Sequence, residues 1–401
     1  MDRPNNKEKA GGTVLLAIAF LGFISLGLPD ALGGVAWPSV REWFELPQSG
    51  LGMVFVALGC GYFLSSFFGG RLTAAMGLGA LLTSSSLLVA LAMFGSGVAP
   101  YWWMFVACAV VWGLGSGAID AGLNAFVASH FSARNVSWLH ACYSLGATLG
   151  PLVMTAAIVK AGSWKLGYGI VGAVMLTMSL LFLVTRRRWA SHTEDAAAEN
   201  PQPASMMSVL SQPIVMLHVV IFFLYTGLEA TVGQWSYTLL TEGRGIGAER
   251  AGVWVAIYFG AIAVGRVLLG VVADCIGLDR LIRLSTVTAL IGALLLAFAP
   301  VMLLAQSGLP VMGLGLAAVF PMMMTRTPQR LGHAMAAHAV GFQVSAAMLG
   351  AATMPLLAGL LVERMGLEVA AIIAVVLASL LFVMHEALMH RSRSVNNPMT
   401  E

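Results

Sequence analysis

Long apolar runs dominate the pattern of hydrophobic and polar positions along this chain. A helix needs about 20 apolar residues to cross the hydrocarbon core of a bilayer. Runs of roughly that size follow one another at Thr13–Val40, Gly50–Ala75, Gly79–Val98, Tyr101–Ser129, Ser137–Lys160, Trp164–Thr185, Ile214–Thr241, Arg250–Cys275, Leu281–Pro300, Val301–Thr325, His333–Glu363 and Leu367–His390. The pattern predicts an all-α membrane protein with twelve transmembrane helices, the ninth and tenth meeting at Pro300.

One long hydrophilic stretch divides these runs into two sets of six. Residues 186–212 contain three consecutive arginines, an acidic segment and several prolines. We therefore expect an N-terminal six-helix bundle over residues 1–185, a cytoplasmic linker over 186–212 and a C-terminal six-helix bundle over 213–401. With the N-terminus inside, 15 of the 21 Lys and Arg residues fall on the inner side. Because basic residues are retained on the cytoplasmic side, both termini are predicted to be cytoplasmic.

The two halves also resemble each other at a constant offset of 200 residues. Glycine positions coincide in the first, second, fourth and fifth helices of each half, as in Gly27-Leu28 with Gly227-Leu228, Gly77-Leu78 with Gly277-Leu278, Gly113-Leu114-Gly115 with Gly313-Leu314-Gly315, and Leu149-Gly150 with Leu349-Gly350. Parallel repeats of six helices occur in transporters whose substrate site lies between the halves near the bilayer midplane. The offset predicts two pseudo-symmetric bundles.

Composition narrows the class of protein further. Hydrophobic residues make up 59% of the 401 positions and charged residues 10%, whereas a soluble domain carries roughly a quarter charged residues. The net charge of +3 gives no reason to expect a nucleic-acid partner. Walker-type phosphate loops, nucleophile–base pairs and metal-ligand spacings are all missing from the sequence. We expect neither an enzyme nor a cofactor, and a proton gradient as the energy source.

A loop motif resembles the signature of the major facilitator superfamily. Gly270-Val-Val-Ala-Asp274-Cys-Ile-Gly277 is followed by Asp279-Arg280, whereas the equivalent first-half loop, Gly70 to Gly77, has Ala74 at the aspartate position. This departure puts the first-half gating contact of typical members in doubt. Arg266 lies eight residues before Asp274, and a buried arginine needs a partner. We therefore expect an inner gate near Arg71, Arg266 and Asp274.

Shorter segments are similar to the fucose permease family of proton-coupled sugar symporters. They are Gly27-Leu-Pro-Asp30 leading to Trp37-Pro38, Gly113-Leu-Gly-Ser-Gly117-Ala-Ile-Asp120-Ala-Gly-Leu-Asn124, His140 before Gly146 and Gly150-Pro151, and Glu229 with Trp235. The resemblance implies that Asp30 is the proton-coupling carboxylate and that Asp120 and Asn124 line the sugar site. The best-known fucose permease carries glutamate where this chain has Asp120. The shorter side chain would enlarge the cavity and could alter the substrate.

Carboxylates inside the predicted helices are functional candidates because each costs about 2.5–3.5 kcal/mol to insert at a helix centre. Asp30, Asp120 and Glu229 are the candidates for proton coupling. Asp120 and Asn124 are spaced i,i+4 and should share one helix face. The predicted substrate-binding residues are Asp30, Trp37, Asp120, Asn124, His140, Tyr143, Glu229, Gln234, Trp235 and Gln343.

Structural alternatives stay open for several of these residues. Asp30 could be a helix-end aspartate near Pro29, and Trp37 an anchor in the aromatic belt at the membrane interface. Glu229 could be tied to an interior arginine or hydroxyl group, and His140 could serve packing.

The favoured hypothesis is a proton-coupled symporter of a small neutral solute, a sugar, that works by alternating access. The alternative within transporters is a proton-driven exporter of apolar or cationic compounds, and outside that class a sensor or scaffold on the same fold. We expect a multi-pass protein of the bacterial inner membrane that is functional as a monomer. Its partners are then the solute, protons and the lipid bilayer. The sequence leaves open which carboxylate carries the proton.

Overall fold

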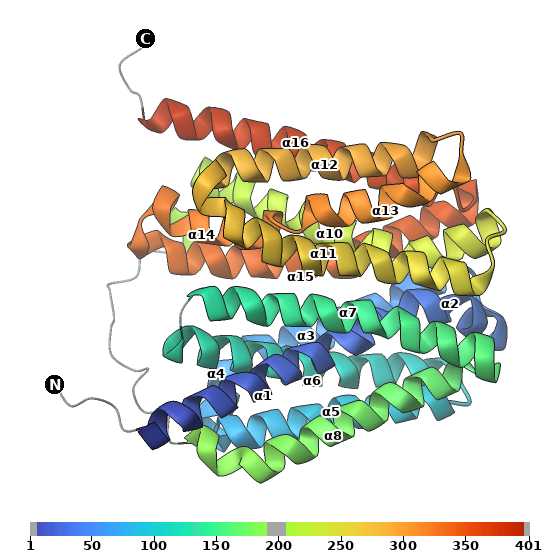
Figure 1. The fold of residues 1–401 in the computed structure, drawn as a ribbon, viewed down its shortest axis with the longest axis horizontal. Coiled ribbons are helices and arrows are strands. Elements are labelled where there is room, and N and C mark those ends of the chain that lie inside the picture. The colour runs from blue at the N-terminus through green and yellow to red at the C-terminus, as the bar shows by residue number, and fades with distance from the viewer. Residues whose placement is uncertain (1–5, 132, 191–205, 397–401) are drawn as a thin grey trace. The chain divides into compact units, whose positions relative to one another are not determined.

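A computed structural model describes residues 6–131, 133–190 and 206–396 of the chain (Figure 1). The regular elements of these residues are all helices. In chain order they are α1 (Asn6–Asp30), α2 (Leu32–Trp43), α3 (Gly50–Phe67), α4 (Gly69–Met76), α5 (Leu78–Val98), α6 (Trp102–His130), α7 (Ala133–Ala161), α8 (Trp164–Ala190), α9 (Met206–Leu210), α10 (Pro213–Thr238), the π-helix η2 (Leu239–Gly243), α11 (Ala248–Ile276), α12 (Leu278–Phe298), α13 (Met302–Leu316), α14 (Val319–Leu331), α15 (His333–Met365) and α16 (Val369–Asn396).

Twelve helical segments in the described residues are long and apolar enough to cross a membrane, which confirms the predicted number. The first combines α1 and α2, which are separated at Ala31, two residues after Pro29. A proline inside a helix lacks an N–H and crowds the preceding turn, so it favours such a break. The boundary expected at Pro300 also holds, because α12 ends at Phe298 and α13 begins at Met302.

The contacts of the chain group its residues into two compact units. Unit 1 comprises Met1–Ala36 and Ala57–Ala198, and unit 2 comprises Trp37–Val56 and Glu199–Glu401. Within unit 1, α1 packs along α7, and α5 packs along both α6 and α8 (Figure 1). Within unit 2, α10 packs along α15, and α12 packs along α13 and α16. Residues 37–56 belong to unit 2, whereas the sequence placed them in the N-terminal bundle.

The helix pairs of the two units correspond at the offset of 200 residues. Helix α5 covers Leu78–Val98 and α12 covers Leu278–Phe298. Each of these helices follows a glycine with positive φ, 78° at Gly77 and 85° at Gly277. Side chains other than glycine rarely adopt this backbone conformation, so the repeat of Gly-Leu in the sequence marks a repeated turn.

Glycines also repeat where two helix backbones touch. A Cβ atom on Gly113 of α6 would lie 2.0 Å from the carbonyl oxygen of Leu58 on α3, and one on Gly313 of α13 would lie 2.4 Å from that of Tyr258 on α11. The partners Leu58 and Tyr258 are themselves 200 positions apart. Small residues allow such close approach, which is how membrane helices gain packing energy without a hydrophobic driving force.

The predicted linker is shorter than expected where the structure describes it. Helix α8 continues to Ala190, and the short helix α9 begins at Met206. Val209 of α9 is fully buried against Val215, Leu331 and Ala339 in unit 2. The remainder of the predicted linker, residues 191–205, lies outside the described residues.

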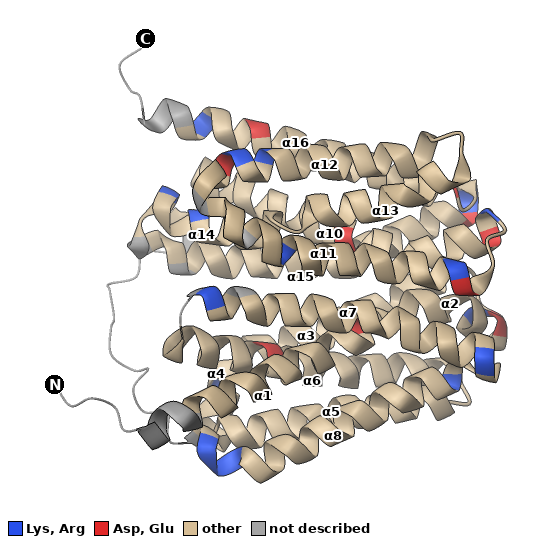
Figure 2. Ribbon diagram, viewed as in Figure 1, with Lys and Arg blue, Asp and Glu red and all other residues tan. Residues whose placement is uncertain are grey.

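Charged residues are concentrated toward the helix ends, and few occur midway along the helices (Figure 2). At one end of unit 2, Arg41 and Gln48 both donate to Glu242, at 3.0 and 2.9 Å. At the same end, Arg244 donates to both carboxylate oxygens of Glu368, at 2.9 and 2.7 Å. The Arg244 side chain is largely buried, so Glu368 compensates a guanidinium that has limited access to water.

Replacing Gly113 with alanine should destabilise the protein by about 1–3 kcal/mol, because the added methyl group overlaps the α3 backbone. Thermal unfolding of the purified protein in detergent measures the loss. Gly169→Ala is the matched control, since a Cβ atom there meets nothing within 4 Å. Equal melting temperatures for the two variants would contradict the close α3–α6 contact.

Replacing Glu368 with glutamine should destabilise the protein at neutral pH by about 1 kcal/mol, since more than half of this side chain is exposed. Hydrogen bonds from Arg244 lower the pKa of Glu368 in the folded state. The stabilisation is therefore complete above the ordinary carboxyl pKa of about 4.3, and it is lost as the pH falls through the lower folded pKa. Melting curves of wild type and variant should converge in acid, whereas the exposed Glu363→Gln should match wild type throughout. A constant difference down to low pH would contradict this role of the ion pair.

Candidate functional site

A hydrogen bond joins α1 to α7 inside unit 1. The hydroxyl group of Tyr143 donates to Oδ2 of Asp30 at 2.7 Å. Close packing brings these side chains together, because a Cβ atom on Gly27 would lie 2.1 Å from the carbonyl oxygen of Tyr143 itself. The indole of Trp112, on α6, lies beside the same carboxyl group. The structure thus brings together Asp30 and Tyr143, two predicted site residues.

A second carboxyl group of unit 1 lies on α6. Asn124 donates to Oδ1 of Asp120 at 2.9 Å, which confirms that the i,i+4 spacing places them on one face. Tyr62 of α3 interacts with the same carboxyl group. Gly117 allows this contact, because a Cβ atom there would lie 2.4 Å from the carbonyl oxygen of Tyr62. Tyr62 was not predicted, since nothing in the α3 sequence identifies its neighbour on another helix.

These side chains form one group, which we call the carboxylate cluster: Asp30, Tyr62, Asp120, Asn124 and Tyr143. Asp30 and Asp120 lie within electrostatic range of each other, and Tyr62 interacts with both. All five side chains are partly exposed, although they lie within membrane-spanning helices. Among the described residues, the ion pairs do not include Asp120. Such a cluster can bind hydroxyl groups and can exchange a proton between acceptors.

Unit 2 has a different polar group, the arginine cluster, formed by Tyr225, Glu229, Tyr258 and Arg266. The Tyr225 hydroxyl group donates to Oε2 of Glu229 and accepts from Arg266 at 3.3 Å. Arg266 lies 3.7 Å from the same carboxylate oxygen. The structure thus supports the alternative in which Glu229 is tied to an interior arginine and a hydroxyl group.

Two of the three predicted gate residues, Arg71 and Arg266, have side chains that the structure describes. Arg266 lies on the α11 face that packs toward α10, where it contacts Glu229 and Tyr225, and its expected pairing with Asp274 stays a prediction. The side chain of Asp274 lies outside the described residues. Arg71 is exposed in unit 1, with its guanidinium 5.8 Å from the ring of Phe68.

Charged contacts that the sequence did not predict occur at the α12 end of unit 2. Asp279 accepts from both Arg326 and Arg330 of α14. Asp279 belongs to the loop motif, and the two arginines are spaced i,i+4 at the end of the tenth apolar run. This spacing places both arginines on one helix face, from which a shared acidic partner could have been predicted.

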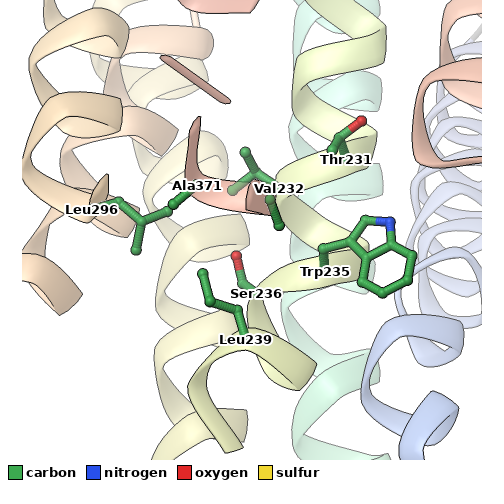
Figure 3. A pocket seen from close by; sticks show the side chains of 8 residues that line it. Thr231, Val232, Trp235, Ser236, Leu239, Leu296 and Ala371 are labelled. Atoms are coloured by element: carbon green, nitrogen blue, oxygen red, sulfur yellow. The ribbon is translucent and has the colours of Figure 1, made fainter. Parts of the chain in front are cut away.

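Two predicted tryptophans are buried in helix packing. Trp235 is 1% exposed, and its Nε1 donates to the carbonyl oxygen of Pro355 at 3.1 Å. Figure 3 shows Trp235 and its α10 neighbours beside a cavity that Leu296 and Ala371 line from other helices. The cavity volume is about 10 Å³, which is room for about one water molecule and not for a sugar. Trp37 is equally buried and donates to Gln48 at 3.0 Å, so it does not face lipid.

Gln234 and His140, two further predicted site residues, also lie among neighbouring side chains. Gln234 is 4% exposed. His140 is partly exposed and lies edge-on to Phe23, with ring centroids 5.8 Å apart.

Gln343 is fully buried in a polar network of unit 2. Its Nε2 lies 2.7 Å from Nδ1 of His218 and 2.9 Å from the hydroxyl group of Thr327. Arg330 donates to Nε2 of His218 at 3.1 Å. A guanidinium group has no acceptor, so Nε2 of His218 is the acceptor in its contact with Arg330.

Comparison with protein families gives a match over most of the chain. The model of the Major Facilitator Superfamily matches residues 15–342 and 236–398. The chain is 24% identical over 320 residues to the human sodium-dependent glucose transporter 1, and the match covers 68% of this chain and 59% of that protein. It is 22% identical over 331 residues to the glucose/mannose transporter GlcP of Bacillus subtilis, covering 78% and 79% of the two chains.

Solved structures show the same fold. A crystal structure of a mutant of the nucleoside transporter NupG superposes with a TM-score of 0.73 at 14% identity. The match covers 94% of this chain and 98% of that one. The twelve-helix architecture is therefore shared with a transporter of distant sequence.

The burial of Trp235 leads to a prediction for Trp235→Phe. This variant keeps most of the ring but leaves the Pro355 carbonyl group without its donor, so we expect a loss of about 1 kcal/mol in thermal unfolding. Trp103→Phe is the control, because Trp103 is 67% exposed. Equal stability of the two variants would contradict a packing role for Trp235.

Proposed function

The chain belongs to the Major Facilitator Superfamily of membrane transporters, and on that basis we propose that it is a proton-coupled symporter of a small neutral solute, a sugar, which works by alternating access. It is a multi-pass membrane protein and not an enzyme. The observation that carries the proposal is the carboxylate cluster, in which Asp30 and Asp120 interact within the membrane-spanning helices of unit 1.

Proton coupling follows from the cost of two like charges in this environment. A carboxylate at a helix centre is costly in the membrane, and a neighbouring carboxylate raises that cost. One proton taken up by the cluster would remove most of the repulsion between Asp30 and Asp120. The loaded carrier could then change conformation without moving an uncompensated pair of charges.

A sugar suits the hydrogen-bonding groups of both clusters. Carboxylate oxygens accept from hydroxyl groups, whereas the amide of Asn124 and the tyrosine hydroxyl groups can donate as well. Arg266 is compensated by Glu229, so unit 2 offers no net positive charge for an anionic solute at this site. The names of the human and Bacillus subtilis relatives point to hexoses as first candidates.

The coupling ion and the location are parts of the same proposal. The human relative is named as sodium-dependent, so sodium is the competing coupling ion. We place the protein in a bacterial inner membrane with both termini in the cytoplasm, as a functional monomer that needs no cofactor. The bacterial relative and the basic residues of the predicted inner loops support this placement.

Sugar-driven proton uptake tests the proposal directly. Purified protein in sodium-free proteoliposomes that contain a pH-sensitive dye should take up protons when the matching hexose is added. Asp30→Asn and Asp120→Asn should each abolish this uptake, because asparagine cannot exchange a proton. Glu249→Gln, an exposed carboxylate outside both clusters, should behave as wild type.

Other outcomes separate the alternatives. Sugar uptake that requires sodium and moves no protons would contradict proton coupling. If no sugar causes proton uptake, and cationic or apolar compounds cause proton release, the protein is instead an exporter. Full activity of both asparagine variants would remove the carboxylate cluster from the mechanism.

A further inference from the structure

We propose that the C-terminal end of α8 binds the headgroup phosphate of an anionic phospholipid through Arg186 and Arg187. The partner is a lipid of the surrounding bilayer, such as phosphatidylglycerol, and it is separate from the transported solute. This inference needs only a protein that spans the membrane, so it does not rest on the proposed symport.

One face of α8 changes from apolar to basic in its last turns. Leu180 and Val184 are 53% and 84% exposed, on a helix that is long and apolar enough to cross a membrane. Side chains three or four positions apart share a helix face, so Arg187 continues the face of Leu180 and Val184. Arg186 and Arg187 are both exposed, and Figure 2 shows basic residues at this end of the helix. The change from apolar to basic side chains indicates the level of the lipid headgroups.

The helix end that carries the two arginines is packed against its neighbours. Trp189 is buried, and its Nε1 donates to the hydroxyl group of Thr185 at 3.1 Å. The ring of Trp189 lies 4.8 Å from that of Phe126 on α6. On the α5 side, a Cβ atom on Gly79 would lie 2.3 Å from the main-chain carbonyl oxygen of Arg186. The arginines therefore belong to an ordered helix end, so binding a headgroup orders side chains but not the backbone.

The part of unit 1 that contains α8 is poor in acidic residues. Residues 57–193 include a single acidic residue, Asp120, and it belongs to the carboxylate cluster. Among the described residues, neither Arg186 nor Arg187 takes part in an ion pair or a side-chain hydrogen bond. Like charges on successive residues repel each other, and an anion that contacts both guanidinium groups would relieve this repulsion.

The corresponding helix end of unit 2 carries its own carboxylates. Arg283 of α12 donates to Glu386 of α16 at 2.7 Å. At the offset of 200 residues, Glu386 corresponds to Arg186, and Asp279 corresponds to Gly79. The close approach of Gly79 to the backbone of Arg186 leaves no room for a side chain there. Unit 1 thus has an arginine and a glycine where unit 2 has carboxylates, and this difference favours a counter-charge from another molecule.

A phospholipid suits this position better than a free phosphate ion does. Its acyl chains can pack on the exposed Leu180 and Val184, while its phosphate contacts the guanidinium groups one turn further along. Arginine binds phosphate oxygens in a bidentate manner. Each basic side chain near the membrane surface strengthens the attraction to anionic lipid by about fivefold. A free phosphate ion would gain the charge contacts alone.

Lipid binding is measured with the purified full-length protein in detergent micelles. Phosphatidylglycerol, phosphatidylcholine or inorganic phosphate is added, native mass spectrometry counts bound lipid, and thermal unfolding measures the stabilisation. Wild type should bind phosphatidylglycerol several-fold more tightly than phosphatidylcholine and should melt at a higher temperature in its presence. The preference should decline at high salt, because screening weakens contacts between exposed charges. Inorganic phosphate should give no comparable stabilisation.

The double variant Arg186→Gln with Arg187→Gln should bind phosphatidylglycerol about 25-fold more weakly, with unchanged binding of phosphatidylcholine. Replacing both arginines with lysine should retain most of the preference, since lysine also binds phosphate as a point charge. The matched control is Lys160→Gln with Arg250→Gln, which removes the same charge at exposed positions outside α8. This control should bind phosphatidylglycerol as wild type does.

Three results would overturn the inference. They are equal binding of the two lipids by wild type, an equal loss in the control variant, and equal stabilisation by inorganic phosphate. A further variant, Glu194→Gln with Asp195→Asn, tests an acidic segment that follows the arginines in the chain and lies outside the described residues. Unchanged lipid binding in this variant supports the proposal, whereas binding at least tenfold tighter than in wild type would assign the arginines to that segment.

Discussion

Close contact between helix backbones at glycine positions sets where the polar side chains of this protein meet. Gly27 brings α1 against α7, and that contact places Tyr143 on Asp30. Gly117 does the same for α6 and α3, and thereby places Tyr62 at Asp120. A larger residue at either glycine would force the two backbones apart, because its Cβ atom would lie 2.1 Å or 2.4 Å from a carbonyl oxygen of the neighbouring helix. The polar side chains of the carboxylate cluster can therefore contact one another only because the glycines let the helix backbones approach closely.

The internal repeat retains close contacts between helix backbones, whereas the polar residues differ between the two units. Contacts of Gly113 with Leu58 and of Gly313 with Tyr258 are the same contact in two units. Residues that need not pack between backbones are free to differ, as Asp120 and Phe320 do. The repeat thus gives two units with the same helix contacts, and each unit can carry different charged residues.

The sequence was sufficient to predict features that depend on a single helix or on a repeat along the chain. The twelve apolar runs, the offset of 200 residues and the Asp120–Asn124 pair all belong to this kind. Contacts between residues on different helices could not be predicted from the sequence, because periodicity does not give the relative axial position of two packed helices. The contact of Arg266 with Glu229 on α10 was for that reason not predicted. Trp235 illustrates the same point, since its partner Pro355 lies 120 positions away.

Membrane proteins can accommodate an interior carboxyl group either by pairing it with a cation or by letting it share a proton. The first arrangement keeps one charge state through a transport cycle, since separating the pair would expose a charge on both partners. The second changes charge readily, because two nearby carboxyl groups favour a single proton between them. Glu229 is paired with Arg266, whereas Asp30 and Asp120 interact electrostatically with each other. Under the proposed symport, a carboxylate that binds solute and a carboxylate that exchanges a proton need different surroundings, and two units with different charged groups can supply both.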